Sequence, residues 1–197
     1  MKNLMIAVAM LFATVSASAQ TPETGSLMVR PMAGVSISNF GTKVTVGSST
    51  QEAVNKWGFT GGAELGYQAL SWLQPSVGLL YSQQGTKFEI TGQSDYSVKT
   101  DYLAIPVLAN FYVADGLALK AGLQPCFLLS AKTDGIDIKD NCNSFQLQIP
   151  IGVSYEYNNF VIDGRMNIPV TKVAKKEYDE DAVNNAFSIT IGYNFEL

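Results

Sequence analysis

The sequence predicts an all-β fold, namely a closed antiparallel eight-stranded up-and-down transmembrane β-barrel. Three observations support this prediction. Eight segments alternate apolar and polar residues, the links between them are alternately short and long, and the first nineteen residues have the form of an export signal. Side chains on a strand point alternately to two faces, so each segment has one apolar and one polar surface. Eight strands of about ten residues with an apolar outer face suit a barrel in lipid.

The start of the chain predicts export. Lys2 supplies a positive charge, residues 4–15 form an apolar run, and Ala17-Ser18-Ala19 matches a small-residue cleavage site. This is the pattern of a secretory signal peptide, and it is too short for a spanning helix. We therefore expect residues 1–19 to be a removed signal peptide and residues 20–197 to form one barrel domain in the outer membrane of the cell. No other run of eighteen apolar residues occurs, so helical membrane spans are not expected.

Composition limits the classes of partner. Hydrophobic residues make up 47% of the chain, a value that a soluble domain also shows, so the prediction depends on periodicity rather than on bulk composition. The formal charge is −4 and no basic stripe is visible, so nucleic acid is not expected as a partner.

The alternation is clearest in Phe145–Tyr157, where every odd-numbered residue is apolar and the even-numbered residues are mostly polar. The other strands follow the same rule. The eight strands are expected at Leu27–Ser38, Trp57–Ala69, Trp72–Gln83, Thr100–Val113, Leu117–Ala131, Phe145–Tyr157, Phe160–Val170 and Ala186–Leu197.

The links between the strands predict the orientation of the barrel. Three links are tight, at Leu70-Ser71, Ala114-Asp115-Gly116 and Asn158-Asn159, and Gly116 suits the left-handed position of a three-residue hairpin. The other links are long and polar. Outer-membrane barrels have short periplasmic turns and longer outer loops, which places both chain ends on the periplasmic side. A soluble β-sandwich also alternates in part, but it need not keep its long loops at one end.

The inward face of the predicted barrel carries six charged residues, three of each sign. Eight strands leave room only for packed side chains, so we interpret these residues as a structural charge network in the lumen rather than as a pore lining. Buried charges need partners, and Lys120 and Glu156 are expected at similar height on neighbouring strands. A proton or substrate relay is the alternative interpretation. The six residues are Arg30, Glu64, Lys120, Glu156, Asp163 and Arg165.

The prolines conflict with an unbroken barrel. A proline inside a strand removes a ladder hydrogen bond, and a closed barrel has no free edge to place it on. Pro106, Pro125 and Pro150 fall on adjacent strands at similar height, so we expect a belt of bulges or broken pairing across the fourth to sixth strands. Prolines inside the expected strands are Pro31, Pro75, Pro106, Pro125, Pro150 and Pro169.

Catalytic and cofactor chemistry is not evident in the sequence. The chain has no histidine, which removes histidine-based triads and the usual zinc sites, so we expect no enzyme, no cofactor and no metal site. Asp179-Glu180-Asp181 lies in a charged segment and reads as a solvated loop tip, with a weak calcium site as the alternative. Gly61-Gly62 and Gly66 lack the helix that a phosphate-binding loop requires, and they are expected to relieve crowding in the barrel.

The two cysteines, Cys126 and Cys142, leave a disulfide open. An exported protein reaches a compartment that permits one. However, Cys126 faces inward within the fifth strand, whereas Cys142 lies several residues higher. A bond requires α-carbons within about 7 Å, so the connecting loop would have to fold into the barrel mouth.

Several segments resemble one known family. The run Asp101–Tyr112, containing Tyr-Leu-Ala-Ile-Pro-Val-Leu, resembles the "YL-x-IP-x-L" strand of the PorT-like outer-membrane β-barrel family of Bacteroidetes. Leu119–Ser130 is similar to its next strand, Asp163-Gly164-Arg165 to its "D-x-R" segment, and Ile191–Phe195 to its closing strand. Leu197 replaces the more usual terminal aromatic residue. The resemblance implies the barrel fold and an outer-membrane location.

Three functional hypotheses follow. The resemblance implies a non-enzymatic barrel with a structural or accessory role through its loops or rim, because founding members of the family are accessory factors of type IX secretion. The alternative is a surface adhesin or defence barrel that acts through the loops near Asn39–Lys56 and Gly85–Lys99. A soluble lipocalin-like carrier ranks third, because it would need an apolar interior. The expected partners are outer-membrane lipid and a protein that the sequence does not identify, and no small-molecule substrate is evident.

Overall fold

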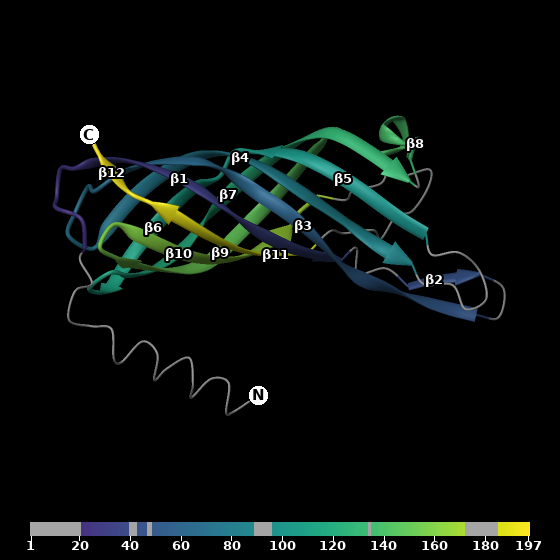
Figure 1. Ribbon diagram of the computed structural model, residues 1–197, viewed down its shortest axis with the longest axis horizontal. Helices are drawn as coiled ribbons and strands as arrows, with labels where there is room; N and C mark the ends of the chain where they lie inside the picture. The colour runs from purple at the N-terminus through teal and green to yellow at the C-terminus, as the bar shows by residue number, and fades with distance from the viewer. Residues whose placement is uncertain (1–20, 40–42, 47–48, 89–95, 134, 172–184) are drawn as a thin grey trace, which may run out of the picture.

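Eight long strands close into one antiparallel barrel in the computed structural model (Figure 1), which describes residues 21–39, 43–46, 49–88, 96–133, 135–171 and 185–197. The expected signal peptide at residues 1–19 lies outside the described residues. One of the eight barrel strands is formed by two segments, β5 and β6. The barrel strands are β1 (Leu27–Asn39), β3 (Ser49–Tyr67), β4 (Leu73–Phe88), β5 (Tyr96–Ala104) with β6 (Val107–Ala114), β7 (Leu117–Thr133), β9 (Phe145–Tyr157), β10 (Phe160–Pro169) and β11 (Asn185–Tyr193).

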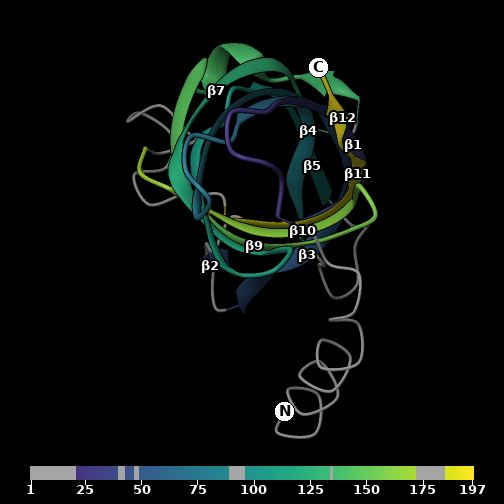
Figure 2. The same ribbon diagram turned by 90° about the vertical axis from the view of Figure 1, so that its left-hand side faces the viewer.

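Closure occurs at β1, which pairs with β3 on one side and with β11 on the other. Figure 2 shows the resulting ring from the end that carries the C-terminus. The shorter elements are β2 (Lys43–Val46), β8 (Ile136–Asp137), the 3-10 helix η1 (Lys139–Asn141) and β12 (Phe195–Glu196). In the described part of the chain, no helix is long and apolar enough to cross a membrane.

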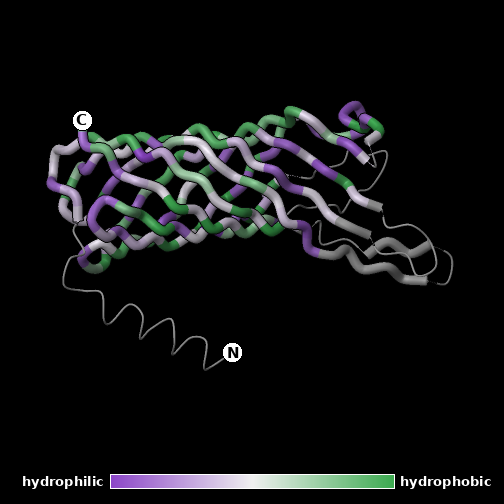
Figure 3. The backbone as a smooth tube through the Cα atoms, viewed as in Figure 1, coloured by the Kyte–Doolittle hydropathy of each residue, from purple (hydrophilic) through white to green (hydrophobic). Residues whose placement is uncertain are grey.

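The predicted division of faces is confirmed. In β9, Ile151 is 52% exposed and Val153 is 42% exposed, whereas Ser154 and Glu156 between the outward residues are buried. The same alternation runs along the other barrel strands and is visible as alternating colour in Figure 3. Apolar side chains therefore cover the outside of the barrel and polar side chains fill much of the inside, as a barrel in lipid requires.

The three predicted tight links form hairpin turns at one end of the barrel. Leu70 and Leu73 exchange backbone hydrogen bonds of 3.1 Å around the first turn. Gly116 has φ +69°, the predicted left-handed conformation. Asn158 and Asn159 have φ values of +46° and +68°, which match a type I′ turn. The C-terminus lies at the same end (Figure 1), so this is the periplasmic end.

The proline belt is present and changes one predicted strand. The expected continuous strand Thr100–Val113 is interrupted at Pro106, so that β5 ends at Ala104 and β6 begins at Val107. The ladder between β7 and β9 is also interrupted, from Ala121 to Gln124, opposite Pro150. In contrast, the ladder between β9 and β10 continues through Pro150 without a shift. The missing proline N–H groups therefore weaken the pairing on one side of each affected strand.

The outer end departs from the expected loops. β3 begins at Ser49 rather than at Trp57, and β2 pairs with its first residues. β4 and β5 likewise extend beyond the predicted ends, to Phe88 and from Tyr96. Much of the two expected loops is therefore strand that projects beyond the barrel (Figure 1). These segments contain β-branched residues but lie beyond the lipid, so they do not show the apolar face on which the prediction depended.

Candidate functional site

The six charged residues singled out by the sequence all lie buried in the lumen. None keeps more than 7% of its surface exposed. Each is flanked along its strand by outward-facing residues, so the strand period fixes its inward direction. β1 supplies Arg30, β3 Glu64, β7 Lys120, β9 Glu156, and β10 both Asp163 and Arg165.

Glu64 is the centre of this network. Its Oε1 lies 2.6 Å from Nη1 of Arg165. Its Oε2 lies 3.8 Å from Nζ of Lys120 and 3.9 Å from Nη1 of Arg30. One carboxylate therefore joins cations from three different strands.

Asp163 is the second anion of the network. Its Oδ2 accepts hydrogen bonds from Lys120 Nζ and, at 3.0 Å, from Arg165 Nη2. Its Oδ1 accepts a bond of 2.7 Å from Arg165 Nε. Asp163 and Arg165 are two residues apart on β10, so both point into the lumen and hold each other in position. Paired charges of this kind tolerate burial only while every partner is present.

Glu156 completes the network at the periplasmic end. Its Oε1 accepts a hydrogen bond of 2.5 Å from Nδ2 of Asn194, and its Oε2 lies 3.8 Å from Nη2 of Arg30. Arg30 Nε also donates to Oδ1 of Asn194 at 2.6 Å. Since Arg30 reaches both Glu156 and Glu64, all six predicted residues belong to one connected network.

Lys120 and Glu156 lie on neighbouring strands as expected, but the expected similar height is wrong. Lys120 stands opposite Gly152 on β9, four residues from Glu156 along the same strand. The amide of Glu156 instead donates to the carbonyl of Gly116 in a turn. A long connection joins β7 to β9, so no tight turn sets their register and the sequence alone does not reveal it.

Inward glycines make room for the network, and the sequence analysis missed their role here. A Cβ atom on Gly152 would lie 3.0 Å from Cγ of Arg165 and 2.5 Å from a backbone oxygen. A Cβ atom on Gly192 would lie 3.0 Å from Cγ of Arg30. Gly152 lies opposite Arg165 in the ladder, and Gly192 lies beside Arg30. Their signal in the sequence is an inward position with no side chain. The tight Asn158-Asn159 turn places Gly152 opposite Arg165, whereas no tight turn sets the register of Gly192.

Buried amides extend the polar interior on both sides of the charges. Toward the periplasm, Gln74 Nε2 donates to Gln68 Oε1 at 3.0 Å, and Asn110 Nδ2 donates to the backbone oxygen of Gln74 at 2.7 Å. Toward the outer end, Gln124 Nε2 donates to Gln148 Oε1 at 2.8 Å. These residues were visible in the sequence as inward polar positions, but their amide pairs depend on register.

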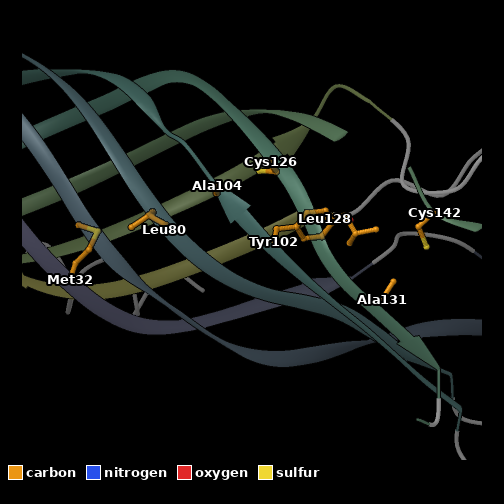
Figure 4. Close-up of a cluster of buried hydrophobic side chains, with 8 residues drawn as sticks. All are labelled: Met32, Leu80, Tyr102, Ala104, Cys126, Leu128, Ala131 and Cys142. Carbon is orange, nitrogen blue, oxygen red and sulfur yellow. The ribbon is translucent and has the colours of Figure 1, made fainter. Parts of the chain in front are cut away.

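The outer half of the lumen contains an apolar cluster (Figure 4). Cys126 is fully buried and Cys142 is 7% exposed, and the two form no disulfide bond with each other. Cys142 directly follows η1 and belongs to the same cluster as Cys126, as a chain that folds into the mouth requires. Members of the cluster are Met32, Leu80, Tyr102, Ala104, Cys126, Leu128, Ala131 and Cys142.

Small cavities remain inside the described part of the barrel. One of about 10 Å³ lies above the charges, beside Gln124 and Arg165. Another, of about 160 Å³, lies at the periplasmic mouth beneath residues 21–23 and beside Glu156. The segment before β1 crosses this mouth in Figure 2, where Gly25 N donates to the carbonyl of Gln68 at 2.8 Å. Side chains therefore fill most of the lumen, as expected for eight strands.

The described residues contain no group of three or more histidine, cysteine, aspartate or glutamate side chains arranged to hold a metal ion. The alternative calcium site at Asp179-Glu180-Asp181 lies outside the described residues. The buried carboxylates of the network are engaged by lysine and arginine.

A closed barrel with an apolar exterior and a filled polar lumen defines the class of outer-membrane β-barrels. The chain belongs to the family described as the outer membrane protein beta-barrel domain, whose model matches residues 18–175. The protein is therefore an outer-membrane barrel. No curated protein matches the sequence.

Solved structures that share this fold include two outer-membrane proteins. OprG from Pseudomonas aeruginosa has 11% sequence identity and a TM-score of 0.53, over 89% of this chain and 99% of that protein. Neisserial surface protein A has 18% identity and a TM-score of 0.50, over 86% of this chain and 97% of that one. Identities this low relate the folds of these proteins and leave their activities separate.

Proposed function

We propose that this protein is a non-enzymatic outer-membrane barrel with a structural or accessory role, acting through its outer end or its rim. The observation that carries the proposal is the filled lumen. Six connected charges, paired amides and an apolar cluster occupy the space that a channel or substrate would need. Contact with partners then falls to the exposed surfaces at the two ends.

We assign the charge network a structural role rather than a role as a proton or substrate relay. Each cation contacts at least one carboxylate, and the three carboxylates are all buried. A relay needs a group that can exchange protons with solvent along a continuous path. Here the side chains of Arg165 and Arg30 pack closely against Gly152 and Gly192, which holds them in place. No cofactor or substrate is part of the proposal.

We propose that residues 1–19 are the export signal and that residues 20–197 form the mature chain. Within the barrel family, the resemblance of Asp101–Tyr112 to the PorT-like strand supports a secretion-associated role. An accessory factor of this kind would contact other membrane proteins through its rim or its ends.

An adhesin or defence barrel is the second candidate, and the projecting strands favour it. β2, the first residues of β3, and the facing ends of β4 and β5 form a sheet beyond the barrel (Figure 1). Such a sheet would offer a surface for contacts outside the cell. The soluble carrier is set aside, because the chain belongs to an outer-membrane family and its apolar belt faces outward.

Deletion of the protein, combined with two assays, separates the candidates. Loss of protein export with surface binding intact supports the accessory role, whereas loss of binding to host or matrix proteins with export intact supports the adhesin. Crosslinking in intact cells followed by affinity capture of the barrel then identifies the contact. A variant that lacks residues 43–52 tests the projecting sheet, and heat-modifiable gel migration verifies that it folds. Unchanged export and binding, together with no crosslinked protein, would contradict both candidates.

A further inference from the structure

Two lysines face each other on the outside of the barrel. Lys99 on β5 is the ladder partner of Lys132 on β7, and both side chains are exposed. Side chains of directly opposed residues in an antiparallel pair lie about 5 Å apart at Cβ, and like charges placed there are destabilising. A pair of this kind is expected where an anion lies between the two ammonium groups.

The two lysines lie just beyond the apolar belt. On the β5 and β6 segments the outward apolar residues run from Val113 to Leu103, and on β7 they run from Leu117 to Leu129. Lys132 follows Leu129 by three residues, and Lys99 precedes Leu103 by four, both on the side away from the periplasmic turns. With a rise of about 3.3 Å per residue and a strand tilt of about 40°, the backbone at the two lysines lies roughly 7–10 Å beyond the last apolar residues of the belt. The headgroup layer extends about 5–8 Å beyond the hydrocarbon, and the long lysine side chains can bend back to bring their ammonium groups into it.

Further charged groups lie near the pair, among them exposed Asp140 next to Lys139 in η1. Lys139 in η1 is exposed and donates from Nζ to the carbonyl of Leu129 at 3.0 Å, so a third cation lies beside the pair. Asp137 is the ladder partner of Lys132 on its other side, but its Oδ1 accepts a hydrogen bond of 2.8 Å from the amide of Lys139. Asp101 lies two residues along β5 from Lys99. Among the described residues, no ion pair joins either lysine to Asp101 or Asp137.

We infer that Lys99 and Lys132 form a binding site on the outer face of the barrel for a phosphate group of the outer-leaflet glycolipid, with Lys139 at its edge. A phosphate carries several acceptor oxygens and can receive hydrogen bonds from two ammonium groups at once. The acyl chains of the glycolipid would lie against Leu129 and Leu103, on the membrane side of the lysines. The same lysines would then anchor the barrel at a fixed depth and order the projecting strands above the membrane. This inference depends only on the outer-membrane location and goes beyond the proposed function.

Binding can be measured on the full barrel refolded in detergent micelles. Native mass spectrometry would follow retention of bis-phosphorylated lipid A by the wild type, by K99Q/K132Q, and by K175Q/K176Q, which removes the same formal charge at two other positions of the sequence. Heat-modifiable migration would verify folding of each variant. Each basic residue near an anionic surface contributes on the order of 1 kcal/mol, so the loss of two is expected to weaken retention roughly thirtyfold. The control variant and D137N are expected to retain the lipid at least as well as the wild type.

Parallel titrations identify the chemistry. Lipid A with its phosphates removed is expected to bind as weakly to the wild type as the intact lipid binds to K99Q/K132Q. Equal retention of intact lipid A by the wild type and K99Q/K132Q would overturn the inference, as would equal retention of the phosphorylated and dephosphorylated lipids. Displacement of lipid A by inorganic phosphate at equal concentration would also overturn it, because the site would then recognise a free anion instead of the glycolipid.

Discussion

At the scale of single residues, Glu64 holds the lumen together because, of the carboxylates that the structure describes, it alone contacts Arg30, Lys120 and Arg165. Its place on β3 lies across the barrel from β7 and β10, so its contacts join strands that are far apart in the sheet order. The stability of the barrel should therefore be sensitive to this side chain.

Glu64→Gln keeps the shape of the side chain and removes its charge. Three buried cations would then compete for two remaining carboxylates, and breaking a buried pair costs about 3–5 kcal/mol. We expect a lower denaturant midpoint for unfolding from micelles, measured by tryptophan fluorescence. Glu196→Gln, at an exposed carboxylate, is the matched control. Equal midpoints for the two variants would show that the network contributes little.

The glycines provide a second test at this scale. Gly152→Ala would place a Cβ atom against Arg165 and a backbone oxygen, and overpacking of this kind costs about 1–3 kcal/mol. Gly164, on the neighbouring strand, has its nearest atoms at 4.0 Å and accepts a Cβ atom without a clash. We expect Gly152→Ala to lower the unfolding midpoint and Gly164→Ala to leave it unchanged or raised, since alanine reduces the entropy of the unfolded chain. A loss of stability in both variants would contradict the steric explanation.

At the scale of elements, the proline belt divides the wall of the barrel into regions with different pairing. Ile105 N donates to the carbonyl of Pro125 at 2.9 Å, but Pro125 has no N–H to donate in return. The ladder between β7 and β9 has a similar gap opposite Pro150. These interruptions fall in the middle of the wall, where no free edge satisfies the remaining carbonyl groups.

Hydrogen exchange should reveal this weakness. Backbone amides in 103–108 and 121–124 are expected to exchange faster in micelles than those in 161–166, where the ladder between β9 and β10 is continuous. Pro150→Ala restores an N–H group opposite Gly122 and is expected to slow exchange in the 121–124 segment. Equal protection of all three segments in the wild type would mean that the wall is not weakened at the prolines. NMR or mass spectrometry can make this measurement.

At the scale of the whole molecule, the sequence was sufficient for the barrel, its strand order and the inward or outward direction of nearly every strand residue. Period-two alternation is a local signal, and Gly116 and Asn158-Asn159 marked their turns because their backbone needs are local too. Relations between distant strands were not accessible. Lys120 lies opposite Gly152 and pairs with Asp163, away from Glu156, because the register of β7 against β9 across a long connection depends on packing of the complete barrel.

The projecting strands are the second feature that the sequence did not predict. Where β3 and β4 leave the membrane, one face is no longer covered by lipid, so the residues there do not need to alternate in polarity. Ser49 and the residues after it therefore read as a loop although they extend β3. The same change of environment makes the outer end the part of the molecule on which partner contacts are proposed.

The alternation along β9 is the central claim, and a spin-label scan from Phe145 to Tyr157 in lipid vesicles tests it most directly. Single labels at outward positions such as Ile149, Ile151 and Val153 are predicted to be accessible to oxygen dissolved in the bilayer. Labels at inward positions such as Gln148 and Ser154 are predicted to be shielded from oxygen and from a water-soluble nickel reagent. A scan without a period of two, or one in which the inward positions face oxygen, would contradict the account.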